Sequence, residues 1–209
     1  MTRTAALFVE VHFDLICPWC LIGKRHLDTA LGMLRDRHPD LDIEVAWHSY
    51  PLLPGIPKQG VPYREFYVQR LGSAAAVAAR QAQVRAAARA AGVEIAFERM
   101  EVFPNSLAAH RLVAQAQAER GSQCAQAMID RLFMSYFVQG RNIGDATVLA
   151  ELASEFDVTL PVEAATPSAD SFRGHGVPCF QFNGEVVIEG AQPPAILLNA
   201  MLGALALAA

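Results

Sequence analysis

The sequence has little charge and no long run of one residue kind, and these absences exclude several classes of protein. Only 18% of its 209 residues are charged, the formal net charge is −4, and no long basic run occurs. We therefore expect no nucleic-acid partner, because nucleic-acid-binding proteins cluster Lys and Arg on one face. No apolar stretch approaches the roughly 18 residues that a membrane-spanning helix needs, so we expect no membrane partner.

The N-terminal stretch also lacks the features of a secretory signal. Its apolar run is interrupted by Glu10, His12 and Asp14, and no small-residue cleavage site follows. We therefore expect a cytoplasmic protein. Structural disulfides are uncommon in that compartment, so closely spaced cysteines there indicate catalysis or metal binding.

Cysteine is scarce, with four in the chain, and the only closely spaced pair is Cys17 and Cys20. A structural zinc site commonly needs two such pairs. Attachment of a c-type haem needs a His directly after the second cysteine, where this chain has Leu21. We expect no metal and interpret Cys17 and Cys20 as a redox pair, with Cys124 and Cys179 as reduced thiols.

A strand–helix–strand pattern surrounds that pair. Apolar and polar residues alternate over residues 7–13 and again over 42–47, which predicts two strands. Between them, Pro18 suits the first turn of a helix, and apolar residues recur at helical spacing until His38. The short charged cluster Lys24-Arg25-His26 is interpreted as a solvated face of this helix. The pattern predicts a right-handed βαβ unit.

The middle of the chain is nearly all helical by the same criteria, and the end returns to strands. Helices are predicted over residues 63–71, 74–91, 107–119, 123–138 and 145–156, with an extended piece at 93–97 and with Ser106, Ser122 and Asp145 as N-caps. Two short strands joined by Asn183-Gly184 predict a hairpin, and a final helix begins at Ala195.

The two ends must share one sheet, because neither a βαβ unit nor a lone hairpin is independently stable. We therefore predict a discontinuous α/β domain, residues 1–60 and 160–209, with an all-α domain of residues 61–159 inserted between its halves.

Four blocks of the sequence resemble a known family. FDLICPWCLIGKRHLDTAL, PNSLAAHRL, LFMSYFVQGRNIGDATVL and GVPCFQFNGEVVIEGAQPP are similar, in order and spacing, to the DsbA-like thioredoxin-fold oxidoreductases, and most of all to their FrnE-type group. The resemblance implies a thioredoxin fold with a mixed central sheet, a CxxC pair at the N-terminus of the first helix and a large inserted helical domain. It also implies that Pro178 is a cis-proline beside the cysteine pair.

The position of the pair suggests its chemistry. The thiolate is the nucleophile in disulfide exchange, and a helix N-terminus favours negative charge on Cys17. Cys20 lies one turn further and would resolve the mixed disulfide. Pro18 pre-shapes the turn, and Trp19 is expected to be exposed as an aromatic surface for the substrate.

Two further pairs of residues are candidates for substrate binding. A cis bond before Pro178 would leave the backbone of Val177 able to pair with an extended substrate. Asn105 and His110 would either line a cleft between the two domains or be an ordinary helix-start Asn and a surface His.

Three residues are candidates for accessory roles, each with a plainer alternative. Asp14 is either a proton relay to Cys20 or a strand-end carboxylate. His12 is either a similar relay or a plain residue of the sheet. Cys179 either points toward the CxxC pair as a third thiol or packs in the core.

The sequence leaves three hypotheses for function. The first is a thiol–disulfide oxidoreductase, with disulfide isomerase activity as an extension, acting on protein or small thiol substrates as a monomer or homodimer without a cofactor other than its redox-active disulfide. The second is a glutathione-dependent isomerase or transferase of the kappa-class or 2-hydroxychromene-2-carboxylate isomerase type, although such proteins usually carry Ser where Cys17 stands. The third is a non-catalytic module in which the pair senses redox state.

Overall fold

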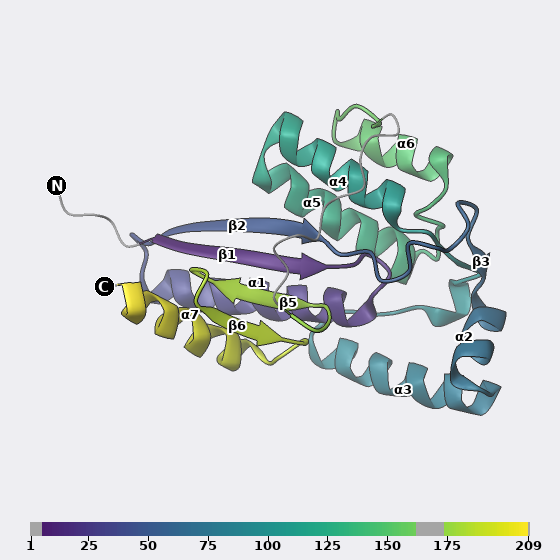
Figure 1. Ribbon diagram of the computed structural model, residues 1–209, viewed down its shortest axis with the longest axis horizontal. Coiled ribbons are helices and arrows are strands. Elements are labelled where there is room, and N and C mark those ends of the chain that lie inside the picture. The colour runs from purple at the N-terminus through teal and green to yellow at the C-terminus, as the bar shows by residue number, and fades with distance from the viewer. Residues whose placement is uncertain (1–5, 162–173, 209) are drawn as a thin grey trace. The chain divides into compact units, whose positions relative to one another are not determined.

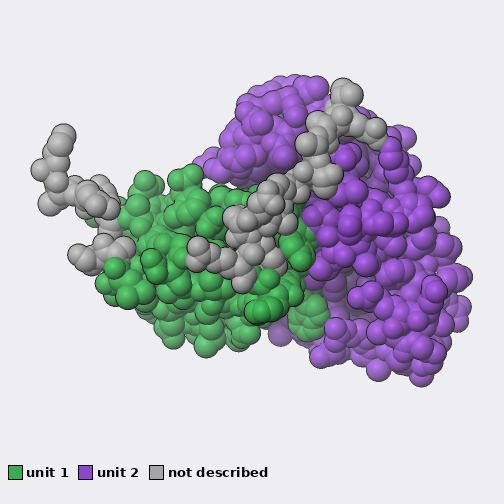
Figure 2. Space-filling view, in the orientation of Figure 1, with its two compact units in different colours: residues 1–13, 19–50, 169–209 green, residues 14–18, 51–168 purple. Residues whose placement is uncertain are grey.

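The chain divides into two compact units, shown in Figure 2. Unit 1 comprises Met1–Phe13, Trp19–Tyr50 and Ala169–Ala209, and unit 2 comprises Asp14–Pro18 and Pro51–Ser168. The structure is a computed structural model that describes residues 6–161 and 174–208.

A four-stranded mixed sheet forms the centre of unit 1, in the order β2-β1-β5-β6 (Figure 1). Strand β1 (Ala6–Phe13) pairs in parallel with β2 (Asp42–Ser49) and antiparallel with β5 (Cys179–Phe182). Strand β6 (Val186–Glu189) completes the sheet beside β5, and α1 (Pro18–Arg37) connects β1 to β2. The predicted βαβ unit and the predicted sharing of one sheet by both ends of the chain are confirmed.

The hairpin between β5 and β6 turns as its sequence predicts. Asn183 and Gly184 have φ angles of 51° and 73°, which is the left-handed region that such a tight turn requires. The Asn183 side chain also accepts a hydrogen bond from the backbone N–H of Phe8, at 2.8 Å. The turn is therefore tied to the N-terminal strand.

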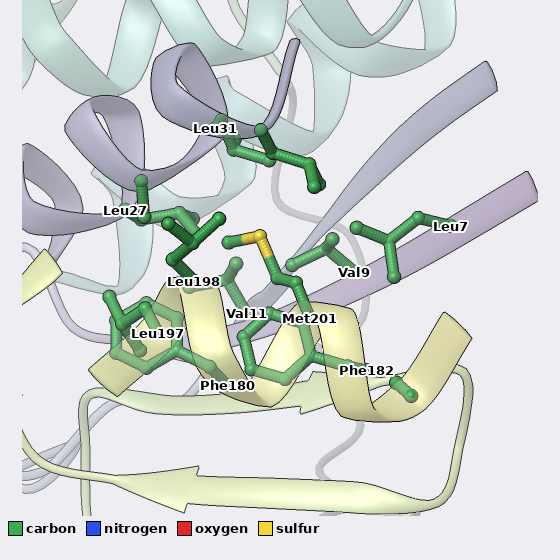
Figure 3. Packing of buried hydrophobic residues seen from close by; sticks show 13 residues of the cluster. Leu7, Val9, Val11, Leu27, Leu31, Phe180, Phe182, Leu197, Leu198 and Met201 are labelled. Carbon is green, nitrogen blue, oxygen red and sulfur yellow. The ribbon is translucent and has the colours of Figure 1, made fainter. Parts of the chain in front are cut away.

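The core of unit 1 lies on one face of the sheet, between the strands and helices α1 and α7 (Pro194–Ala208) (Figure 3). Side chains on a strand alternate between faces, and the apolar members of each strand point toward the helices. The strands contribute Leu7, Val9, Val11, Phe180 and Phe182, each at most 1% exposed. Leu27, Leu31 and Leu34 of α1 and Leu197, Leu198 and Met201 of α7 close the other side.

Unit 2 is built mainly from helices. They are α2 (Tyr63–Leu71), α3 (Ala74–Ala90), α4 (Leu107–Arg120), α5 (Ser122–Phe133) and α6 (Ala146–Glu155), as Figure 1 shows. A π-helical segment (Met134–Val138) extends α5, and a short 3-10 turn covers Phe97–Arg99. Strands β3 (Val61–Pro62) and β4 (Val102–Phe103) form a small sheet that the sequence did not predict.

The helix starts of unit 2 confirm one predicted cap and correct two. Asp145 caps α6 by accepting from the N–H groups of Thr147 and Val148. Ser106 makes no side-chain cap, because the preceding Asn105 accepts from the N–H of Leu107 instead, at 2.9 Å. Ser122 is already inside α5, and the residue before it, Gly121, occupies the cap position. The extended piece predicted at 93–97 is also wrong at its end, where the 3-10 turn begins.

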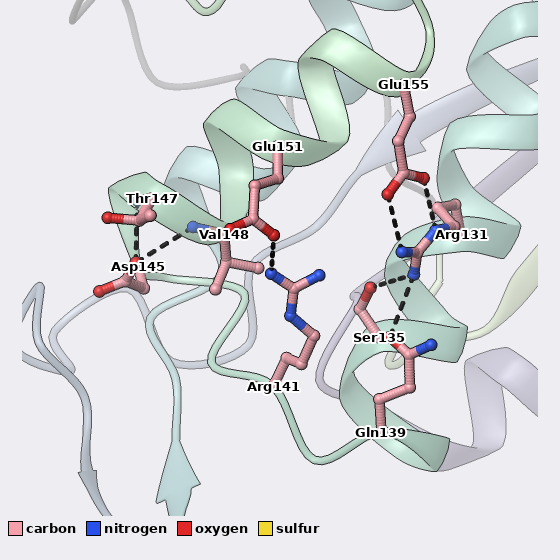
Figure 4. A network of polar contacts seen from close by, with 9 residues as sticks. All are labelled: Arg131, Ser135, Gln139, Arg141, Asp145, Thr147, Val148, Glu151 and Glu155. Atoms are coloured by element: carbon pink, nitrogen blue, oxygen red, sulfur yellow. Dashed lines mark hydrogen bonds and ion pairs between the residues drawn. The ribbon is translucent and has the colours of Figure 1, made fainter.

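Charged side chains join α6 to α5 and to the segment that follows α5 (Figure 4). Arg131 contacts both oxygens of Glu155, at 2.7 and 2.9 Å, and reaches Ser135 and Gln139 with a third nitrogen. Arg141 forms an ion pair with Glu151, which lies on α6 like Glu155. These bidentate and shared contacts fix the orientation of α6 in unit 2.

The two units differ in their bounds from the predicted domains. Residues 14–18 and 51–60 belong to unit 2, although the sequence assigned both to the discontinuous domain. The reason is polar bonding. The Asp14 carboxylate accepts from the N–H of Leu52, at 2.6 Å, and the Asn105 amide donates to the carbonyl of Ile56.

Candidate redox site

Cys17 directly precedes α1, and Cys20 lies in the first turn of that helix. The N–H of Cys17 donates to the carbonyl of Asp14, at 3.1 Å, which closes a tight turn before the helix. Pro18 supplies the first helical residue, where its missing N–H leaves nothing unsatisfied. The two cysteines are three positions apart, which is the spacing of neighbouring side chains on a helix. Cys17 is 7% exposed and Cys20 is 2% exposed.

Pro18 and Trp19, between the two cysteines, are half-buried. The sequence predicted an exposed Trp19, and the structure corrects this. An indole that is only partly accessible still offers an apolar edge to a substrate, and its other side packs against protein.

Asp14 shapes the turn that carries Cys17, and it is fully buried. Its Oδ1 accepts from the N–H of Ile16, at 3.3 Å, and lies 3.0 Å from Nε2 of His110. Its Oδ2 accepts from Leu52, as described above. A buried carboxylate needs such partners because an unpaired buried charge is very costly. The Cys17 turn is therefore held by polar bonds within unit 2.

His110 lies on α4 and has no exposed surface. The structure thus corrects the surface interpretation of this residue and brings it to Asp14, which lies 96 positions earlier in the chain. The sequence named both residues as candidates but placed them in separate domains and did not pair them.

Tyr67 of α2 is a site residue that the sequence reasoning missed. Burial, and to a smaller extent negative charge on Cys17, raise the pKa of Tyr67 to about 12. The phenol is therefore neutral at physiological pH, and its O–H lies within electrostatic range of the Cys17 sulfur. A possible signal was the spacing of Tyr63 and Tyr67, which share one face of α2 and whose ring centroids are 4.7 Å apart.

Tyr136, in the π-helical segment, extends this polar cluster into the interior of unit 2. It is 1% exposed. Burial holds its pKa well above the ordinary value, and Tyr67, Tyr63 and Asp14 act in the same direction. The cluster thus combines neutral phenols with the Asp14–His110 pair.

Asn105 has a structural position in unit 2. Its amide donates to the carbonyls of Pro54 and Ile56, and its oxygen caps α4 through the N–H of Leu107. Both ends of the side chain are occupied by backbone partners, so it holds the 51–57 loop against the start of α4.

Pro178 lies against α1 in unit 1. The Val177–Pro178 peptide bond is cis, as the family resemblance implies. A Cβ added to Gly23 would lie 2.8 Å from Cγ of Pro178 and 3.1 Å from Cζ of Phe180. Because Gly23 follows Cys20 by three residues, the proline contacts α1 on the helix face that carries Cys20.

The structure also corrects the interpretation of Lys24 as part of a solvated helix face. This lysine is 1% exposed instead of solvated. Its Nζ lies 3.0 Å from Asp28 and 5.6 Å from the centre of the Trp47 ring. A compensated cation is therefore buried one helical turn after Cys20.

Cys179 and His12 lie on the face of the sheet opposite α1. They pair across strands β5 and β1, and the alternation that sends Phe180 into the core turns them the other way. Burial raises the pKa of the Cys179 thiol to about 11, and Glu189 adds to the effect. This position and this protonation both argue against a third reactive thiol.

His12 packs against His48, with ring centroids 4.8 Å apart. Burial lowers the pKa of His12 to about 4, and His48 contributes in the same direction. His12 is therefore a neutral residue of the sheet at physiological pH.

Among the described residues, no group of three or more His, Cys, Asp or Glu side chains could hold a metal ion. No helix in residues 6–161 or 174–208 is long and apolar enough to cross a membrane. Both findings concern the described part of the chain.

Comparison with known proteins now identifies the family. The family model of the DSBA-like thioredoxin domain matches residues 8–202. The chain belongs to this family. Its fold is therefore the thioredoxin-like DsbA fold that the four sequence blocks implied.

Individual relatives agree with this assignment. A probable DsbA oxidoreductase from Streptomyces coelicolor has a TM-score of 0.78 and 26% identity, over 95% of this chain and 89% of that one. The uncharacterized protein YwbO of Bacillus subtilis (strain 168) is 26% identical over 148 residues, which is 70% of this chain but only 64% of YwbO. A 2-hydroxychromene-2-carboxylate isomerase shares 12% identity and a TM-score of 0.56 over 95% of this chain and 96% of its own, which shows a common fold alone.

Proposed function

We propose that this protein exchanges disulfides through Cys17 and Cys20. The observation that carries the proposal is their placement at the start of α1, with Cys17 directly before the helix and Cys20 in its first turn. That end of a helix stabilises a thiolate through its unpaired N–H groups and dipole. The substrate, a protein or small-molecule disulfide, and the cytoplasmic location are parts of the same proposal.

The exchange proceeds in two steps. The Cys17 thiolate attacks one sulfur of the substrate disulfide, forming a mixed disulfide as the substrate S–S bond breaks and a substrate thiolate leaves. Cys20 then loses its proton and attacks the Cys17 sulfur, which releases the second substrate thiol. Two electrons pass from the protein dithiol to the substrate, and the reverse sequence oxidises a substrate dithiol.

Residues around the pair would support these steps. A neutral Tyr67 phenol can donate a hydrogen bond to sulfur negative charge, and the Asp14–His110 pair holds the turn that presents Cys17. Pro18, Trp19, Val177 and Pro178 are proposed to contact the substrate, with the Val177 backbone pairing with an extended segment.

Single cysteine variants test the proposal. We expect Cys17→Ser to abolish insulin reduction and the refolding of scrambled ribonuclease. Cys20→Ser should instead trap a mixed disulfide on Cys17, visible by mass spectrometry. Cys124→Ser is the matched control, because this half-buried cysteine lies on α5. Full activity of Cys17→Ser would refute the proposal.

A glutathione-dependent isomerase or transferase is the second candidate, because the same fold occurs in 2-hydroxychromene-2-carboxylate isomerase. Titration calorimetry with glutathione separates the two functions. Binding that survives Cys20→Ser, together with insulin reduction that is absent in the unmodified protein, would favour this candidate.

A further inference from the structure

Unit 2 contains a pocket whose described lining residues lie outside the redox site. It has a volume of about 320 Å³ and is bordered by the first turn of α4, by α6 and by the segment at residues 160–161. That volume is within the range of small-molecule sites in proteins, roughly 300–1,000 Å³. None of Cys17, Asp14 and Tyr67 lines it.

Two of the described residues that line this pocket are cationic side chains. Lys58 and Arg111 line it, and none of its described lining residues is a carboxylate. Arg111 is half-buried, and its Nε is buried without a hydrogen-bond partner among the described residues. A buried N–H without an acceptor costs free energy. An anion in the pocket would offset the positive charge of this guanidinium.

The remaining wall is apolar. Leu107 and Ala108 of α4, Leu149 of α6, and Leu160 form most of it. The one amide in the lining, Asn105, already has backbone partners at both ends. A highly polar anion such as a nucleotide would therefore leave many of its polar atoms without donors here.

We propose that this pocket binds a small carboxylic acid with an apolar body. The carboxylate would pair with Arg111, whose guanidinium suits bidentate recognition of a carboxylate. The apolar body would lie against the leucines of α4, α6 and residue 160.

Octanoate is a suitable probe, and titration calorimetry on the full chain is the measurement. We expect saturable binding of octanoate to one site. Octanol, which has the same chain without the charge, should bind at least about tenfold more weakly, the effect of losing one charge-assisted hydrogen bond. Equal affinity for the two probes, or no octanoate binding up to millimolar concentration, would overturn the proposal.

Variants locate the site. Arg111→Gln should weaken octanoate binding about tenfold or more, and Ala108→Trp should block it by filling the pocket. Arg35→Gln is the matched control, an exposed arginine on α1 in unit 1, and should bind like the unmodified protein. Cys17→Ser should also bind octanoate normally, so failure of the redox proposal would leave this result unaffected. Unchanged affinity in both pocket variants would show that octanoate binds elsewhere.

Discussion

Both units bury apolar side chains, and they differ in the directional contacts that accompany this packing. Unit 1 depends on one apolar cluster between its sheet and helices α1 and α7, in which the strand residues are almost fully buried (Figure 3). Unit 2 uses many directional contacts, including the Arg131 and Arg141 ion pairs (Figure 4) and the buried Asp14–His110 pair. Apolar contacts have no preferred direction. A hydrogen bond, in contrast, restricts the distance between donor and acceptor to a range of a few tenths of an ångström.

The candidate site residues divide in the same way. In unit 1, Gly23 lies close to Pro178 on the helix that also carries Cys20. Those in unit 2, Asp14, Tyr67 and His110, are polar side chains near or beneath the Cys17 turn. We infer that unit 1 provides a rigid helix and that unit 2 adjusts the reactivity of the residue preceding it. Four predictions test this difference, in order of expected size.

The largest effect is expected at Asp14. Asp14→Ala removes the acceptor for Ile16 and Leu52 and leaves His110 without its carboxylate. Breaking such a buried pair typically costs about 3–5 kcal/mol, and we expect that loss in urea unfolding. The exposed Asp36→Ala should change stability by less than about 0.5 kcal/mol. A loss below about 1 kcal/mol for Asp14→Ala would show that the polar network does not anchor unit 2.

The second effect concerns His12 and pH. Its pKa is about 4 in the folded protein, below the ordinary 6.5, so the unfolded chain binds the extra proton between these values. Above about pH 6.5, His12 therefore does not lower the free energy of unfolding. As pH falls toward 4, protonation of His12 in the unfolded chain lowers the free energy of unfolding by up to about 3 kcal/mol. Urea unfolding at pH 7 and pH 4.5 should show a smaller drop for His12→Gln than for the unmodified protein. His38→Gln, on an exposed histidine, should leave the drop unchanged, and identical drops in all three proteins would contradict the prediction.

A smaller effect is expected from two glycines of the same helix. Gly23→Ala places a methyl group 2.8 Å from Pro178, and we expect a loss of about 1–3 kcal/mol from overpacking. Gly32→Ala meets nothing within 4 Å and should raise stability by up to about 1 kcal/mol, because Ala is the better helix former. Thermal unfolding measures both. Equal shifts in the two variants would mean that Pro178 does not pack tightly on α1.

The smallest effect should appear in reactivity and not in stability. Tyr67→Phe removes the O–H near Cys17, and we expect alkylation of Cys17 by iodoacetamide at pH 7 to slow about tenfold. The assay uses the Cys20→Ser background, with mass spectrometry to locate the label. Tyr63→Phe is the matched control, because the charge of Cys17 is not among the influences on Tyr63. If both variants react at the unmodified rate, unit 2 does not adjust Cys17.

Much of the fold followed from the sequence because it depends on local patterns. The alternation at residues 7–13, Pro18 at a helix start and Asn183-Gly184 at the hairpin are short-range signals, and each was confirmed. The cis bond at Pro178 came only from the resemblance, since most X-Pro bonds are trans.

The rest could not be predicted because it depends on chain segments that meet only after folding. Asp14 and His110 are 96 positions apart, and the contact follows from how α4 packs. Ser106 looked like a helix cap by residue type, but the neighbouring Asn105 reaches the same N–H groups better once it also holds the 51–57 loop. The sequence predicted a solvated Lys24. In the structure this lysine is buried, beside the ring of Trp47 and the carboxylate of Asp28.

The five residues Asp14–Pro18 have a consequence for how this protein can be divided. They join unit 2 although they lie between β1 and the rest of α1 in the sequence. The helical segment is therefore not a cassette that can be cut out or transplanted, because residues 51–168 contain Leu52 and His110, the long-range partners of Asp14. Any shortening of that segment in this protein has to preserve Leu52 and His110, or the turn that carries Cys17 loses its support.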